Sequence, residues 1–195
     1  MMLSNQKNME IHLFRAWSIA RRYLVTNGFD GALTMLGMLA GFYSTGMTEL
    51  SVIISACLGA AIALFISGLS SAYLSEKAER EKELAELEQA LVADLQKSDY
   101  GQASRYLPIL VALVNGLSPL LLSLLILSPL FLAEQGYILV FSPLIDAIAL
   151  GLTCTFFFGV FLGKISQKYW LWSGLKSLMI AVITVAIILL FGHSG

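Results

Sequence analysis

Charged residues are scarce in this sequence of 195 residues. Asp, Glu, Lys and Arg make up 13% of it, against about 25% in an average soluble domain. Hydrophobic residues make up 57%, so the composition excludes an ordinary soluble domain and indicates a membrane protein. The net charge of -1 excludes a general nucleic-acid binder, because such a protein needs a basic surface to neutralise phosphates.

The sequence is also poor in residues that build enzymatic or thiolate sites. Its two cysteines, Cys57 and Cys154, lie inside apolar runs and form neither a disulfide framework nor a Cys-x-x-Cys motif. The two histidines, His12 and His193, are isolated from each other, and no Ser-His or Cys-His constellation is present. We therefore do not expect an enzyme.

Long apolar runs are the dominant feature of the sequence. A membrane-spanning helix needs about 20 apolar residues, and four runs meet this length: 50–74, 106–133, 137–163 and 170–191. A fifth run, 24–47, contains five glycines and Asp30. We count it as a span because of the distribution of Lys and Arg, which gather on the cytoplasmic side of membrane proteins.

All twelve Lys and Arg residues precede the first run, lie between the second and third, or surround the link from the fourth to the fifth. The other two connections and the C-terminal tail contain none. Five spans place every positive charge on one side of the membrane. The sequence thus predicts an all-α integral membrane protein with a cytoplasmic N-terminus and an external C-terminus.

Two segments are expected outside the hydrocarbon. Residues 1–27 form an amphipathic segment that is predicted to lie in the membrane interface, and residues 28–195 form the five-helix membrane domain. Within that domain, residues 76–104 form a cytoplasmic acidic insert that continues the second span as a helix. Four leucines of the insert follow a helical stripe that suits packing on a partner helix: Leu84, Leu87, Leu91 and Leu95.

Four glutamates of the insert share one helical face: Glu76, Glu79, Glu83 and Glu86. Their spacing is compatible with offering carboxylates to a hard cation. A solvated charged face has the same spacing, so both interpretations stay open.

Polar residues within the runs are candidates for a functional role, because an ionisable group costs about 3 kcal/mol in hydrocarbon. Four of them are candidates for lining a transport path: Thr34, Tyr73, Asn115 and Asp146. Asp30 shares a helical face with Thr34 and Met38 beside a glycine-broken helix, and breaks of this kind free backbone carbonyls for ions. The alternative is that Asp30 caps the first span. Asn115 and Asp146 are both expected near the bilayer midplane, where an interhelical hydrogen bond between them is the alternative to a role in transport.

The second run carries two ridges of small residues, one containing Ser55, Gly59 and Ala63 and the other Ala56 and Ala60. Small residues let helix backbones approach closely. We expect a homodimer packed through these ridges and through the glycine-rich first run.

Three segments resemble the vacuolar iron transporter family: FDGALTMLGMLAG at 29–41, SSAYLSEKAERE at 70–81 and WSGLKSLMI at 172–180. The resemblance covers about residues 28–192 and implies a five-span, dimeric exporter that exchanges Fe²⁺ or Mn²⁺ for protons. It also implies a metal ligand at Asp30, a tyrosine after the second span at Tyr73 and a cytoplasmic acidic helix over 76–88. The chain departs from the family at Gly68 and Ala72, where a methionine and a glutamate are usual.

Two functions follow from these observations. The first is a transporter of Fe²⁺ or Mn²⁺ in which Asp30, helped by Met35 or Met38, takes the ion while the glutamates gather ions at the entrance. No permanently bound cofactor is expected. The second is a membrane scaffold or regulatory protein that retains the fold and binds a partner through the leucine stripe.

Overall fold

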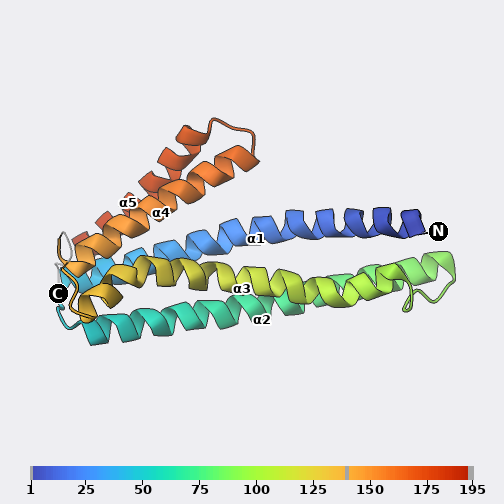
Figure 1. The fold of residues 1–195 in the computed structure, drawn as a ribbon, viewed down its shortest axis with the longest axis horizontal. Helices are drawn as coiled ribbons and strands as arrows, with labels where there is room; N and C mark the ends of the chain where they lie inside the picture. The colour runs from blue at the N-terminus through green and yellow to red at the C-terminus, as the bar shows by residue number, and fades with distance from the viewer. Residues whose placement is uncertain (1, 139–140, 193–195) are drawn as a thin grey trace. The chain divides into compact units, whose positions relative to one another are not determined.

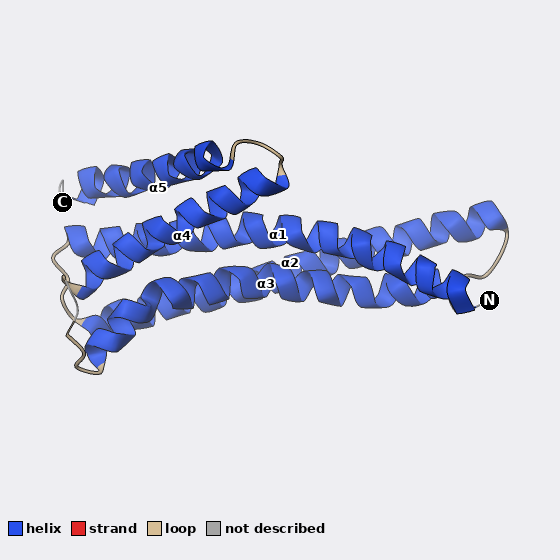
Figure 2. Cartoon of the chain, turned by 45° about the horizontal axis from the view of Figure 1, so that its top comes forward, coloured by secondary structure: helices blue, strands red, loops and turns tan. Residues whose placement is uncertain are grey.

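The computed structural model describes residues 2–138 and 141–192, with side chains from residue 21 onward. These residues form helices and connecting loops, with no strand among them (Figure 1, Figure 2). The helices are α1 (Met2–Ser44), α2 (Leu50–Leu91), α3 (Asp99–Glu134), α4 (Pro143–Ile165) and α5 (Trp170–Gly192). The prediction of an all-α protein is confirmed.

Four of the helices, α2 to α5, are long and apolar enough to cross a membrane. The helices α2, α3 and α5 each contain one of the long apolar runs recognised in the sequence, and α4 contains the run 137–163 from Pro143 onward. The protein is therefore described below as a membrane protein with at least these four candidate spans.

Helix α1 continues through the glycine-rich run without an interruption. The sequence predicted a glycine-broken first span, and that expectation was wrong. Single glycines weaken a helix by about 1 kcal/mol each but leave its hydrogen-bond ladder intact. The placement of residues 1–27 in the membrane interface stays a prediction, and the side chains of this segment are described only from Arg21 onward, so that His12, like His193, lies outside the described part.

Glycines end two of the helices. Gly46 and Gly136 have φ values of +69° and +86°, which side chains with a Cβ rarely adopt. After α1, the N–H of Met47 donates to the carbonyl of Phe42 at 3.1 Å. After α3, the N–H of Tyr137 donates to the carbonyl of Leu132 at the same distance. Both ends follow the Schellman pattern, which satisfies carbonyls that would otherwise lack partners.

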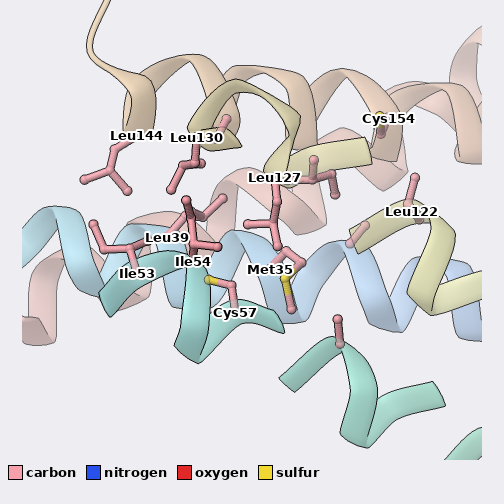
Figure 3. Packing of buried hydrophobic residues seen from close by; sticks show 14 residues of the cluster. Met35, Leu39, Ile53, Ile54, Cys57, Leu122, Leu127, Leu130, Leu144 and Cys154 are labelled. Atoms are coloured by element: carbon pink, nitrogen blue, oxygen red, sulfur yellow. The ribbon is translucent and has the colours of Figure 1, made fainter. Parts of the chain in front are cut away.

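The chain divides into two compact units. The bundle unit contains Val25–Leu64 and Ser118–Gly195, and the extension unit contains Met1–Leu24 and Phe65–Leu117. In the bundle unit, one apolar cluster joins side chains of α1, α2, α3 and α4, among them Met35, Cys57, Leu127 and Leu144 (Figure 3). The C-terminal half of α1 is thus packed among helices that are apolar enough to span a membrane.

Small residues govern the closest contacts of the bundle unit. A Cβ added at Gly31 would lie 2.8 Å from Cα of Pro119, and one at Gly163 would lie 2.7 Å from Cβ of Ser173. A Cβ at Gly159 would also collide with the hydroxyl of Ser177. The glycines therefore permit α1 to approach α3 and α4 to approach α5.

The extension unit pairs the C-terminal half of α2 with the N-terminal half of α3, joined by the loop after Leu91. The helical extension of the second run is confirmed, but it ends at Leu91 rather than continuing through the insert. Leu95 consequently lies in the loop and not on the predicted leucine stripe. Leu84 is buried, whereas Leu87 and Leu91 are 37% and 62% exposed, so only the end of the stripe is free for a partner.

Candidate functional site

Asp30 occupies the interior of α1. Its backbone carbonyl accepts the i→i-4 bond from the Thr34 hydroxyl at 2.7 Å, and the residue is exposed in the single chain. The helix extends well before Asp30, so the alternative that this residue caps a helix N-terminus is wrong. Helix capping therefore does not explain why a carboxylate is present at this position.

The two methionines near Asp30 have apolar surroundings. Met35 is fully buried in the cluster that also holds Leu39, Ile54 and Cys57 (Figure 3). Met38 is partly buried and packs against the same cluster. A thioether fills space in such a core as any apolar side chain does, so the described packing explains Met35 without a metal.

The glutamate face of α2 contains a cation that the sequence analysis left out. The guanidinium of Arg80 donates to Glu83 Oε2 at 2.7 Å through Nη1 and contacts Glu76 Oε2 at 3.4 Å through Nη2. Glu79 and Glu86 are exposed, and Glu86 lies 3.9 Å from Lys82. Three of the four carboxylates, those of Glu76, Glu83 and Glu86, therefore already have a positive partner.

Tyr100 links this network to α3. Its hydroxyl donates to Glu83 Oε2 at 3.0 Å, so Glu83 accepts bonds from both Arg80 and Tyr100. Burial raises the pKa of Tyr100, the bond to Glu83 and its negative charge raise it further, and Arg80 opposes the shift. The arrangement fastens the beginning of α3 to the extension of α2.

No group of three or more His, Cys, Asp or Glu side chains is close enough to share a metal ion in the part of the chain that the structure describes. The glutamate face is therefore not an assembled metal centre within one chain. Binding of an ion by Glu76 or Glu83 would require that carboxylate to exchange Arg80 for the metal.

Asn115 is buried and holds α3 against α2. Its Nδ2 donates to the carbonyl of Gly68 at 2.6 Å. A Cβ added at Gly68 would lie 3.3 Å from the carbonyl oxygen of Asn115, and one at Gly116 would lie 2.8 Å from that of Phe65. The amide thus makes an interhelical hydrogen bond at a contact between two glycines.

Asp146 lies in the first turn of α4. This helix begins at Pro143 with Ser142 as its N-cap, and not at residue 137 as predicted. The Asp146 carboxylate accepts from the N–H of Phe141 at 3.2 Å. The midplane depth of Asp146 was counted from residue 137, and that start of the span was wrong. The carboxylate lies in the first turn of α4, where its negative charge is favourable, and binds the residue before the Ser142 cap.

Tyr73 is half-buried on α2, as the last aromatic residue before the charged extension. The ammonium of Lys77 lies 5.7 Å from the centre of its ring, within range of a cation–π contact. The structure thus places Tyr73 with a basic side chain, a partner that the sequence analysis did not assign to it.

Comparison with known proteins identifies a relative of this chain. No family model matches the chain. The uncharacterized protein MJ0645 of Methanocaldococcus jannaschii is 33% identical over 170 residues, which cover 86% of this chain and 85% of that protein. The chain belongs to the family of that protein. The match extends over most of both chains, so the family shares the region that contains the candidate residues, and its function has to be argued from those residues.

Proposed function

We propose that the protein is a transporter that moves a divalent metal ion, Fe²⁺ or Mn²⁺, out of the cytoplasm, with proton exchange as the coupling that the resemblance implies. The observation that carries this proposal is the carboxylate of Asp30 in the interior of an uninterrupted helix. A carboxylate costs free energy in hydrocarbon, so a membrane helix that retains one at such a position is a candidate for a functional site. Carboxylate oxygens suit these ions, whereas a zinc site more often contains His or Cys.

The proposal includes five spans, with residues 25–44 of α1 as the first. It is supported by the buried residues Met35 and Leu39 of α1, which pack in the bundle unit against side chains of α2, α3 and α4, three helices apolar enough to cross a membrane. Asp30 is six residues after Leu24, or about 9 Å along the helix axis, at the cytoplasmic end of this span. The one-sided distribution of Lys and Arg supports a cytoplasmic N-terminus and an external C-terminus.

The proposal also includes a homodimer. Ser55, Gly59, Ala63 and Ser67 are all exposed along α2, and a Cβ at Gly59 would meet nothing within 4 Å. This ridge is free in the single chain and permits close approach of a second copy. Asp30 is exposed as well, and a second copy would remove its carboxylate from lipid.

The glutamates of α2 have a supporting role in this proposal. Glu79 and Glu86 are exposed and would attract cations to the cytoplasmic entrance, whereas Glu76 and Glu83 share Arg80. Solvated carboxylates bind ions weakly and replace one another. We assign them to gathering ions and not to carrying them across the membrane.

The experiment is a flux measurement in proteoliposomes that contain the purified full chain, with Fe²⁺, Mn²⁺, Zn²⁺ and Ca²⁺ tested in parallel. Asp30→Asn keeps the size of the side chain and removes its charge, so we expect normal insertion and loss of most of the Fe²⁺ or Mn²⁺ flux. Asp146→Asn is the matched control. Its oxygen can still accept from Phe141, so we expect it to retain most of the flux.

Equal flux from the parent and Asp30→Asn would eliminate Asp30 as the carrier. Absence of flux from the parent chain with every ion would instead favour a scaffold or regulatory protein. One observation favours that second function: Leu91 and Val92, at the end of α2, are 62% and 91% exposed outside the apolar run. Apolar side chains exposed to water in this way are typical of a surface that binds a partner.

A further inference from the structure

A pocket of about 400 Å³ opens between α2 and α3 in the extension unit. Its lining includes Tyr73, Lys77 and Glu81 from α2, Gln96 from the loop, and Arg105 and Pro108 from α3. The pocket shares Tyr73 with the candidate transport path, and its other lining residues have no role there. Its residues belong to one compact unit, so its shape does not depend on how the two units are arranged.

The pocket lies where both helices change from apolar to charged. On α2 the apolar run ends near Leu74, and the charged extension follows at once. On α3 the apolar run begins at Tyr106, directly after Arg105. Leu74 and Tyr106 are 65% and 70% exposed, as expected for side chains that contact lipid near the membrane surface. Aromatic and basic residues at such boundaries lie at the level of the lipid headgroups.

The lining of the pocket carries two basic groups, Lys77 and Arg105, and two acidic groups, Glu81 and Glu88, so its formal charges balance. The basic groups are nearest the apolar runs, because Lys77 is three residues after Leu74 and Arg105 directly precedes Tyr106, whereas both glutamates are farther along the extension of α2. The membrane end of the pocket therefore favours an anion. The carboxylate of Glu88 already accepts hydrogen bonds from the loop, from the N–H of Leu95 at 2.9 Å and from Nε2 of Gln96 at 3.3 Å. Both basic side chains remain to face a ligand.

The contacts of the two basic side chains leave them able to bind. Lys77 is 3.9 Å from Glu81, and their side chains are 49% and 69% exposed, so the ion pair is weak. The bond from Arg105 to Gln96, at 3.1 Å, uses one of the five N–H donors of the guanidinium. A guanidinium and an ammonium together match the oxygens of a phosphate ester.

The membrane end of the pocket also has apolar lining. Pro108, which is buried, and the half-buried ring of Tyr73 lie within the apolar runs, whereas Leu84 is ten residues, or about 15 Å, farther along α2 than Leu74. A soluble phosphate would gain nothing from Tyr73 and Pro108, whereas a phospholipid would place its glycerol backbone and the beginning of an acyl chain there. This end of the pocket thus combines two basic groups with apolar ones.

From these observations we propose that this pocket binds the phosphate of a phospholipid headgroup through Lys77 and Arg105. Basic pockets between membrane helices bind anionic lipids by the same chemistry. The bound lipid would join α2 to α3 at the membrane surface and stabilise the extension unit there.

The test measures lipid binding to the purified full chain in detergent by native mass spectrometry. The probes are dioleoylphosphatidylglycerol, dioleoylglycerol, which lacks the phosphate, and inorganic phosphate. The variant K77Q/R105Q removes both basic groups of the pocket. The matched control K82Q/K97Q removes the same charge from α2 and the loop, and its Lys82 is likewise 3.9 Å from a glutamate, Glu86, outside the pocket.

We expect K77Q/R105Q to bind phosphatidylglycerol about tenfold more weakly than the control variant, since each basic residue near a membrane surface contributes appreciably to such binding. Dioleoylglycerol should bind both variants equally, and inorganic phosphate should not displace the phosphatidylglycerol. A second variant, Ser104→Leu, fills the pocket without changing its charge and should also lose the lipid. It provides the test if K77Q/R105Q does not fold.

Equal affinity of K77Q/R105Q and K82Q/K97Q for phosphatidylglycerol would overturn the proposal. Displacement of the lipid by inorganic phosphate would also overturn it, because the pocket would then belong to a soluble anion. Retention of the lipid by a folded Ser104→Leu protein would show that the lipid binds elsewhere.

Discussion

The packing of α1 in the bundle unit can be tested at Gly31. Replacing Gly31 by Ala adds a Cβ that would lie 2.8 Å from Cα, 2.9 Å from Cβ and 3.0 Å from the carbonyl oxygen of Pro119. Ordinary Cβ contacts begin at 3.4 Å, so α1 and α3 would have to separate by about 0.6 Å at this point. The neighbouring atoms are backbone and a proline ring, which cannot rotate away as a flexible side chain does.

The matched control for this prediction is Gly41→Ala in the same helix, where a Cβ meets nothing within 4 Å. Both variants gain the same helix propensity of about 1 kcal/mol, so their difference isolates the cost of overpacking. That cost is typically about 1–3 kcal/mol. We expect Gly31→Ala to be less stable than Gly41→Ala by about this amount.

The measurement is unfolding of the purified chain in mixed micelles of increasing SDS content, followed by circular dichroism. A shift of Gly31→Ala to lower SDS, beside an unchanged or higher midpoint for Gly41→Ala, is the expected result. Equal midpoints for the two variants would refute the contact between Gly31 and Pro119. They would also remove the packing argument for α1 as a span.

Three further outcomes are expected. A reporter fused after Gly195 should be active only outside the cytoplasm, since five spans from a cytoplasmic N-terminus end there, and cytoplasmic activity would exclude five spans. Gly59→Leu should weaken cross-linking between copies of the chain. The control Ile62→Leu replaces one bulky exposed residue of α2 by another and should leave cross-linking unchanged. A Gly59→Leu protein that still cross-links as a dimer would place the interface elsewhere. Ser142→Ala should destabilise the protein by about 1 kcal/mol through loss of the α4 cap, and an unchanged unfolding midpoint would show that Asp146 alone suffices.

Much of the helical architecture follows from the sequence. The extension of α2 was predictable because residues 76–88 contain neither Gly nor Pro and carry charges at helical spacings. The beginning of α4 was also within reach, since Ser142 followed by Pro143 is a usual start of a helix. The depth of Asp146 was misjudged because the apolar residues from 137 were counted as part of the span.

Other features depend on contacts that spacing cannot supply. Asn115 donates to a backbone carbonyl 47 residues away. Every residue has such a carbonyl, so the sequence does not identify the acceptor. Arg80 is at helical distance from Glu76 and Glu83, so its pairing was open to prediction. The contact of Tyr100 with Glu83 could not be predicted, because the length and conformation of the loop between α2 and α3 determine which residues of the two helices face each other.

The contact between α2 and α3 at Gly68 limits which residues can occupy that position. The backbone of Asn115 would lie 3.3 Å from any Cβ there, and a longer side chain would have to displace it. Gly68→Met alone would therefore separate the two helices at this point. A larger residue at position 68 requires compensating changes at residues 115 and 116, so substitutions at these three positions are coupled.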